Sequence, residues 1–323
     1  MQRKNNFWTG WIMPVTQLIR LPNLLIIILT QGLLRVCVLQ NLHRDDLEGL
    51  SDFYGFVLLV LATVLIAIAG YVINDYYDVR IDEINKPGKQ VVASFISYRG
   101  AIKVHLLLNG IAILIGIFLA IRIKVPGFGL IFPFIAGLLW LYSAKYKRMV
   151  FWGNFIVALL SSIVILIVWL FFYYSLRLNP THFELVLPYL AWTSRIFMAY
   201  ALFAFLVSLF REIIKDMEDQ EGDKSYGCRT LPLVIGIKIS RFIVLFIVVL
   251  TILILGYLQF FLYSLDQYLI LWYLLVAVQL PMVILVLKLF FATEKKDFHF
   301  MSTLSKVIML SGILSMLLLL TVN

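Results

Sequence analysis

Nine stretches of about 20 apolar residues constrain the fold of this chain more than any other feature. A helix needs about 20 residues to cross a hydrocarbon core about 30 Å thick, and its backbone polar groups must be satisfied within the helix. The apolar stretches cover residues 21–40, 54–73, 101–121, 128–144, 151–174, 189–210, 241–263, 268–291 and 302–321. Only 14% of the 323 residues are charged and 62% are hydrophobic, which is too few charges for a soluble surface. We therefore predict an all-α, polytopic membrane protein with nine transmembrane helices.

The distribution of Lys and Arg predicts the orientation of these helices. Of the 27 basic residues, 21 belong to the N-terminus and the even-numbered loops and five to the odd-numbered loops, and Arg35 lies inside the first helix. Such an excess marks the cytoplasmic side of a membrane. We therefore expect a cytoplasmic N-terminus in the cell (inner) membrane. The net charge of +9 is explained by this topology, so we expect no nucleic-acid partner.

Two of the predicted cytoplasmic loops, residues 74–99 and 211–241, hold ten of the 18 acidic residues. In both loops three aspartates are spaced by three and then four residues: Asp75, Asp78 and Asp82 in the first, and Asp216, Asp219 and Asp223 in the second. Each triplet follows an even-numbered helix, and the two triplets lie 141 residues apart. This repeat predicts a single domain, residues 1–323, with two related helical halves and an Asp-rich motif after the second helix of each.

The spacing within each triplet has a chemical consequence. If the preceding helix continues past its apolar part, residues at i, i+3 and i+7 share one face of the helix. Carboxylates grouped at a membrane boundary repel one another and call for a compensating cation. Oxygen ligands suit Mg²⁺, and Asn74 adds a neutral oxygen beside the first triplet. The alternative interpretation is a set of solvated loop charges.

Basic residues in the same loops supply charges that a bound diphosphate would need. The candidates are Arg80, Lys86 and Lys89 after the first triplet, Lys145, Lys147 and Arg148 after the fourth helix, and Lys215 and Lys224 beside the second triplet. The alternative for each of them is a role in membrane topology alone.

These motifs resemble those of the UbiA superfamily of intramembrane prenyltransferases. NDYYDVRID, residues 74–82, and DMEDQEGD, residues 216–223, are similar to the two Asp-rich motifs of that family. The resemblance extends to RLPN at residues 20–23, to residues 142–148, to Gly153-Asn154 and to TLPLVIG from Thr230.

The resemblance implies a nine-helix bundle around a central cavity, with Mg²⁺ and a prenyl diphosphate at its cytoplasmic side. The implied metal ligands are Asn74, Asp75, Asp78, Asp82, Asp216, Asp219 and Asp223. The implied catalytic residues are Asp78, Asp219, Tyr142 and Lys147. The implied substrate-binding residues are Asn23, Arg80, Lys86, Lys89, Lys145, Arg148 and Lys215. Loss of diphosphate would create an allylic cation, which the ring of Tyr142 would stabilise.

Within this family the chain looks most like the branch that makes digeranylgeranylglyceryl phosphate. That branch transfers a geranylgeranyl group from its diphosphate to geranylgeranylglyceryl phosphate, a lipophilic acceptor in membrane lipid biosynthesis. The segment NKPGKQVVAS, residues 85–94, departs from the branch pattern, because Lys86 and Lys89 replace arginines and two prolines and a glycine are absent. Two alternatives stay open: an aromatic acceptor of the quinone, haem or chlorophyll pathways, and a cation-coupled membrane transporter.

Overall fold

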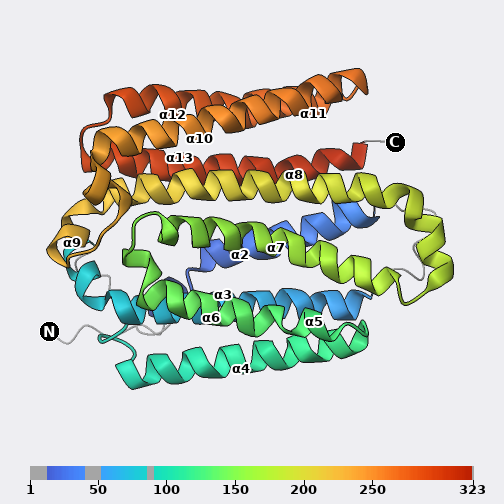
Figure 1. The fold of residues 1–323 in the computed structure, drawn as a ribbon, viewed down its shortest axis with the longest axis horizontal. Coiled ribbons are helices and arrows are strands. Elements are labelled where there is room, and N and C mark those ends of the chain that lie inside the picture. The colour runs from blue at the N-terminus through green and yellow to red at the C-terminus, as the bar shows by residue number, and fades with distance from the viewer. Residues whose placement is uncertain (1–12, 41–51, 86–90, 322–323) are drawn as a thin grey trace, which may run out of the picture. The chain divides into compact units, whose positions relative to one another are not determined.

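Helices make up almost all of the described chain, which comprises residues 13–40, 52–85 and 91–321 of this computed structural model (Figure 1). Within these residues nine helices are long and apolar enough to cross a membrane. They are Leu21–Leu39, Phe53–Glu83, Tyr98–Arg122, Pro126–Ala144, Trp152–Leu176, Pro180–Glu218, Leu231–Ser264, Tyr268–Phe291 and Lys295–Thr321. The chain is therefore an integral multi-pass membrane protein with an all-helical fold, as predicted. The central cavity and the cytoplasmic N-terminus stay predictions.

The chain divides into two compact units. The first comprises Met1–Leu29 with Asp52–Lys147, and the second comprises Thr30–Ser51 with Arg148–Asn323. The described helices of the first unit are α1 (Met13–Leu18), most of α2 (Leu21–Leu33), α3 (Phe53–Asn85), α4 (Tyr98–Arg122), α5 (Pro126–Gly129) and α6 (Ile131–Ala144). Those of the second are η2 (Leu34–Gln40), α7 (Trp152–Leu176), α8 (Pro180–Glu218), α9 (Gln220–Ser225), α10 (Leu231–Ser264), α11 (Tyr268–Tyr273), η4 (Leu274–Gln279), α12 (Leu280–Phe291), α13 (Lys295–Leu314) and η5 (Ser315–Thr321). The short 3₁₀ segment η3 (Tyr146–Arg148) crosses the boundary between the units.

Helix α3 organises the first unit, where it packs against α4 and α6 (Figure 1). Its first 21 residues, 53–73, carry no charge and are followed directly by the first Asp-rich motif. With 33 residues the helix is about 50 Å long, which exceeds a hydrocarbon core of about 30 Å. The motif therefore lies on the part of α3 that continues beyond the apolar run.

A small hydrophobic cluster supports that end of α3. Val72 and Val79 share one face of the helix and pack with Leu18 of α1, with Val92 and with Ala101 of α4. Since the apolar side chains cover one face, the polar side chains of the motif occupy the remaining faces of the helix.

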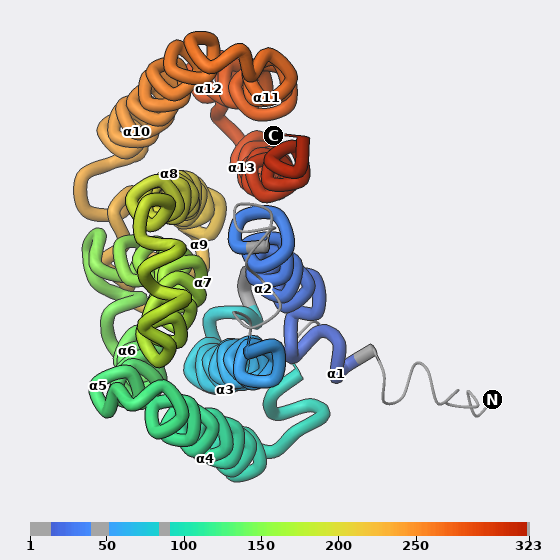
Figure 2. Tube along the Cα trace, turned by 90° about the vertical axis from the view of Figure 1, so that its right-hand side faces the viewer, coloured from blue at the N-terminus to red at the C-terminus, as the bar shows by residue number. Residues whose placement is uncertain are grey.

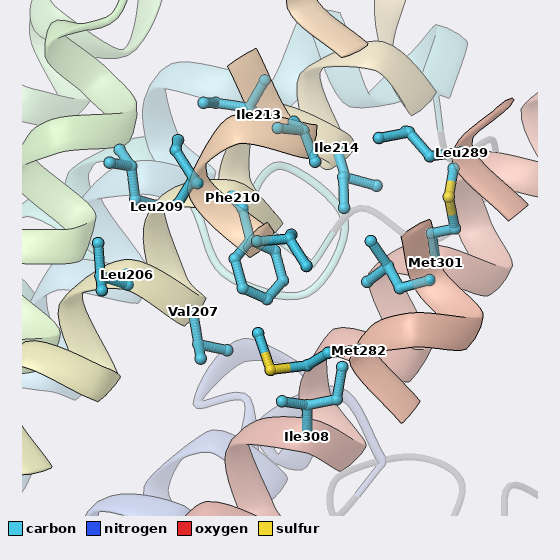
Figure 3. Close-up of a cluster of buried hydrophobic side chains, with 14 of the residues drawn as sticks. Leu206, Val207, Leu209, Phe210, Ile213, Ile214, Met282, Leu289, Met301 and Ile308 are labelled. Carbon is cyan, nitrogen blue, oxygen red and sulfur yellow. The ribbon is translucent and has the colours of Figure 1, made fainter. Parts of the chain in front are cut away.

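Helix α8 organises the second unit, where it packs against α7, α10 and α13. Figure 2 shows α13 beside both α8 and α12. In Figure 3 the side chains of Val207 and Phe210 on α8 point toward Met282 on α12 and toward Met301 and Ile308 on α13. This apolar core fixes α8, which carries the second motif at its end.

Helix α10 is interrupted at Gly236. This residue has φ 83° and ψ 157°, a backbone conformation that is accessible almost only to glycine. The segment TLPLVIG therefore forms a short helical turn, and the long apolar part of α10 begins after the kink.

Candidate functional site

The first Asp-rich motif lies entirely on α3, so the predicted continuation of the helix past its apolar part is confirmed here. Asn74 and Asp78 are both buried, and the Nδ2 of Asn74 donates a hydrogen bond of 2.8 Å to Oδ2 of Asp78. Asp82 is one further turn along the helix and half-buried. Three oxygen-bearing side chains thus follow one another along a single helical face.

Lys147 forms an ion pair with Asp78, whose side chain is only 3% exposed. Burial alone would lower the pKa of the Lys147 ammonium, but the Asp78 carboxylate and the nearby Tyr142 phenol outweigh burial, and the pKa is raised. The Asp78 carboxylate therefore favours the charged form of Lys147 beside the first motif. The structure brings together Asp78, Tyr142 and Lys147, three residues that the sequence assigned to catalysis.

Arg20 forms an ion pair with Asp75, as Lys147 does with Asp78. Sequence analysis gave Arg20 no role in the site. Its Nη2 lies 2.7 Å from Oδ1 of Asp75, and its guanidinium lies 4.9 Å from the centre of the Tyr71 ring. Burial lowers the pKa of Arg20, yet Asp75 raises it by more, so the guanidinium stays charged. Arg20 joins α1 to α2 in a left-handed conformation, φ 51°, which is strained for a residue with a side chain. The RLPN segment noted in the sequence includes Arg20, but no local pattern in it indicates the pairing with Asp75.

The second motif is divided between two helices, unlike the first. Helix α8 ends at Glu218, Asp219 has φ −93° and ψ 9°, and α9 begins at Gln220. Asp216 therefore lies on α8 and Asp223 lies on α9, so these three aspartates do not share one continuous helix. The bend falls at an aspartate, a residue type that favours helix ends over helix interiors.

Asp216 is held by Asn154 of α7. The Nδ2 of Asn154, which is 5% exposed, donates a hydrogen bond of 2.8 Å to Oδ2 of Asp216. Asp223 is also buried, and its backbone carbonyl accepts a hydrogen bond from the backbone N–H of Cys228. Asn154 is a second partner that the sequence did not assign, although it belongs to the Gly153-Asn154 pair noted in the sequence.

The remaining predicted residues have varied positions. Asn23 is half-buried on α2, Arg80 and Lys145 are exposed, and Lys215 is half-buried on α8. The carbonyl of Arg148 accepts a hydrogen bond of 2.9 Å from the backbone N–H of Arg229. Lys86 and Lys89 lie outside the described residues.

The side chains of both motifs have the chemistry of a hard-cation site. Carboxylate and amide oxygens are the ligands that Mg²⁺ prefers, and the first motif offers four such side chains on one helix. Within the described residues, no three His, Cys, Asp or Glu side chains gather closely enough to form a metal site by themselves. The metal assignment therefore depends on donor type, and the ligand set stays a prediction.

Comparison with known proteins identifies relatives over most of the chain. A family model described as the UbiA prenyltransferase family matches residues 47–322. The chain is 33% identical over 184 residues to a digeranylgeranylglyceryl phosphate synthase of Thermococcus sibiricus. The aligned stretch covers 57% of this chain and 57% of that protein. The chain is 34% identical over 193 residues to the enzyme of the same name from Saccharolobus solfataricus, which is 58% of this chain and 60% of that protein. The matched stretch thus spans less than two thirds of these relatives.

Solved structures share the fold over nearly the whole chain. A structure described as that of digeranylgeranylglyceryl phosphate synthase matches with a TM-score of 0.59 and 24% identity, and covers 94% of this chain and 98% of the other. A UbiA homologue from Archaeoglobus fulgidus, bound to DMAPP and Mg²⁺, matches with a TM-score of 0.53 and 16% identity. That alignment covers 93% of this chain and 98% of the other. At these identities the likeness concerns the fold.

Proposed function

Because the chain belongs to the UbiA prenyltransferase family, we propose that it transfers a prenyl group from a prenyl diphosphate to a lipophilic acceptor. The proposed donor is geranylgeranyl diphosphate, and the proposed acceptor is geranylgeranylglyceryl phosphate. The relatives named digeranylgeranylglyceryl phosphate synthase support this choice of substrates. Membership in this family leaves the transporter alternative without support.

The observation that carries the proposal is the first motif with its fixed cations. Asp78 is buried between the amide of Asn74 and the ammonium of Lys147, and Asp75 is held by Arg20. A buried carboxylate without such partners would be costly, so this end of α3 is built to hold a high density of charge. A diphosphate with its metal is a ligand of that charge density.

The residues proposed to hold Mg²⁺ are Asn74, Asp75, Asp78 and Asp82 in the first unit and Asp216, Asp219 and Asp223 in the second. When bound, the metal would neutralise charge on the diphosphate and favour its departure. The ammonium of Lys147 would bind a diphosphate oxygen and stabilise the negative charge that develops there.

The proposed reaction breaks the bond between C1 of the prenyl group and the diphosphate oxygen, and the electron pair leaves with the diphosphate. The acceptor hydroxyl oxygen then bonds to C1 and releases its proton to an oxygen of the departing diphosphate. The ring of Tyr142 would stabilise the allylic cation through its π electrons. Water must be excluded meanwhile, because it would capture the same cation.

The proposed location is the cell membrane, with the reaction at its cytoplasmic face. The first motif directly follows an apolar helical stretch, the second begins six residues after the end of one, and the excess of Lys and Arg belongs to the same side of the membrane.

The first prediction concerns Asp78→Asn and Asp219→Asn. Each change removes one carboxylate charge at nearly constant size, so each should lower transfer by about 100-fold or more. The measurement is formation of radiolabelled product from Mg²⁺, labelled geranylgeranyl diphosphate and geranylgeranylglyceryl phosphate. Aromatic acceptors are offered in separate reactions, and the product identifies the acceptor class.

The control for these variants is Asp266→Asn. Asp266 is exposed, has a left-handed backbone that asparagine also tolerates, and lies far along the chain from either motif. It should keep full activity. Full activity in both motif variants, or activity that a chelator leaves unchanged, would contradict the metal assignment.

A further inference from the structure

A histidine and an asparagine are buried inside the apolar part of α4, outside both Asp-rich motifs. His105 is 2% exposed and Asn109 is 7% exposed. Nδ1 of His105 lies 2.8 Å from the carbonyl oxygen of Ala69 on α3, which can only accept, so Nδ1 carries the proton. Nε2 is then an acceptor, and Nδ2 of Asn109 donates to it over 3.1 Å. The imidazole is therefore uncharged and has a hydrogen bond at each nitrogen.

This polar pair costs stability that apolar side chains would not. The carbonyl oxygen of the Asn109 amide is buried and has no hydrogen-bond partner in the described chain. A buried acceptor without a donor is costly, and polar side chains inside a membrane span are costly in themselves. A leucine at either position would avoid that cost. The pair therefore calls for a role that an apolar residue would not fulfil.

His105 lies at a defined level of the pairing between α3 and α4. Toward the other end of α4, Arg122 donates two hydrogen bonds to Asp52, which directly precedes α3. From Asp52 to Ala69 is 17 residues, and from Arg122 back to His105 is also 17. The two helices are therefore antiparallel and keep one register over this length. The His105 bond is the end of that register nearer to the first motif.

His105 also contacts α6 at the same level. Its ring lies edge to face with the ring of Trp140 on α6, with 5.1 Å between the ring centres. Gly70, next to Ala69 on α3, faces Leu139 on α6, since a Cβ added at Gly70 would lie 3.0 Å from Cδ1 of Leu139. His105 thus contacts both helices at the level where their own side chains meet.

Two equal lengths of chain lead from this level to the proposed active site. From Gly70 to Asp78 is eight residues along α3, and from Leu139 to Lys147 is eight residues along α6 and into η3. The two segments run in the same direction, since Asp78 and Lys147 meet again as an ion pair. A helix rises about 1.5 Å per residue, so a slip of one residue between α3 and α6 would displace one charge past the other by about that distance.

We infer that His105 is a positioning residue, which sets the register of α3 against α6 and thereby aligns Asp78 with Lys147. The inference rests on the proposed function, in which Asp78 holds the metal and Lys147 binds the diphosphate. The hydrogen bond of His105 fixes α3 and its ring contact fixes α6, so one side chain of a third helix aligns both charged groups. A misplacement of about 1 Å can cost about 100-fold in rate, even when the altered residue is far from the reacting atoms.

The experiment compares three replacements of His105 in nanodiscs. His105→Asn places an amide nitrogen where Nδ1 lies and keeps a donor for the Ala69 carbonyl. His105→Gln places its amide nitrogen where Nε2 lies, and His105→Leu has no donor. If size alone mattered, glutamine would be the best replacement, because it is the closest to histidine in volume. The inference instead predicts that His105→Asn keeps the wild-type register and that the other two variants lose it.

The register is measured as the distance between two spin labels, in a background with both cysteines replaced by alanine. The labels are attached at Val57→Cys on α3 and Phe134→Cys on α6, which are both exposed positions. His105→Asn should retain the wild-type distance. His105→Gln and His105→Leu should shift it by about 1 Å or more, because one residue of sliding is about 1.5 Å.

Equilibrium binding of inorganic pyrophosphate in the presence of Mg²⁺ measures the consequence for the site. His105→Gln and His105→Leu should bind pyrophosphate about tenfold more weakly than wild type, and His105→Asn should bind it equally well. The matched control is Ser143→Ala, because this buried hydroxyl donates to the Leu139 carbonyl of its own helix. It should match wild type both in label distance and in binding.

An unchanged label distance in His105→Leu would overturn the inference, and so would a distance closer to wild type in His105→Gln than in His105→Asn. Wild-type pyrophosphate binding in a variant whose register has shifted would also overturn it, because the site would then not depend on the register. If wild-type protein binds no pyrophosphate and transfers to no acceptor, the proposed function fails. The label distances still decide in that case whether His105 sets the register.

Discussion

At the scale of single residues, an asparagine amide holds one aspartate in each motif. Asn74 donates to Asp78 from within the same helix, and Asn154 donates to Asp216 from a neighbouring helix. An amide donor stabilises a carboxylate without adding charge, so the carboxylate keeps its full attraction for a cation. The second of these bonds also ties α7 to α8.

Asn154→Ala should therefore destabilise the protein by about 1 to 3 kcal/mol, because it leaves the half-buried carboxylate of Asp216 without this donor. It should also raise the Mg²⁺ concentration needed for half-maximal transfer. Thermal unfolding in detergent and a Mg²⁺ titration of activity measure these two effects. Ser161→Ala is the control, because that hydroxyl donates to the Val157 carbonyl of its own helix and so ties no two helices together. A variant that matched wild type in both measurements would show that this hydrogen bond has no role.

Sequence patterns pointed to the aspartates of the candidate site, but not to Arg20 and Asn154, the side chains that bind two of them. The repeated spacing of the aspartates marks them, and the basic segment after the fourth helix includes Lys147. Arg20 and Asn154 lie 55 and 62 residues from the aspartates that they bind. Such pairings depend on how the helices pack, and no local spacing records them.

At the scale of elements, the kink in α10 depends on one glycine. Gly236→Ala should destabilise the protein by about 1 to 3 kcal/mol, because alanine does not readily adopt φ 83° with ψ 157°. Space is not the reason, since an added Cβ would meet no atom within 4 Å. The measurement is the midpoint of thermal unfolding.

Gly256→Ala on the same helix is the matched control. An added Cβ there also meets no atom within 4 Å, and the backbone is helical. This change should leave stability equal or raise it by up to about 1 kcal/mol. If both variants unfolded at the same temperature, the glycine conformation at the kink would not matter.

All nine predicted spans correspond to helices, but three helices begin at least seven residues earlier than hydropathy indicated. Helix α13 begins at Lys295 instead of residue 302, because Lys295, Lys296 and Asp297 lower the hydropathy of its first turn. Helix α8 begins at Pro180 instead of residue 189, because His182, Glu184 and Pro188 lower the hydropathy of its first turns. Asn179 is the N-cap of this helix, and an asparagine at that position is the sequence feature that indicates the earlier start. Helix α10 begins at Leu231 instead of residue 241, because Lys238 and Arg241 interrupt the apolar stretch. For the bend at Asp219 the sequence offers only two weak indications, which are Asp219 itself and the nearby Gly222.

At the scale of the whole molecule, the distribution of Lys and Arg predicts which loops face the cytoplasm. In a background with Cys37 and Cys228 replaced by alanine, Asp266→Cys should react with an impermeant thiol reagent added outside intact cells. Lys295→Cys should react only after the membrane is opened. The reverse pattern would show that the predicted orientation is inverted.

The uncharged run at the start of α3 has a consequence for the lipid surroundings of the enzyme. The 21 residues from Phe53 to Ile73 span about 31 Å, close to the thickness of a typical hydrocarbon core, and Asn74 follows at once. The length of this run therefore sets the depth of the carboxylates. A thicker bilayer would draw them toward hydrocarbon, and a thinner one would leave apolar turns in water, so membrane thickness itself becomes a condition for catalysis.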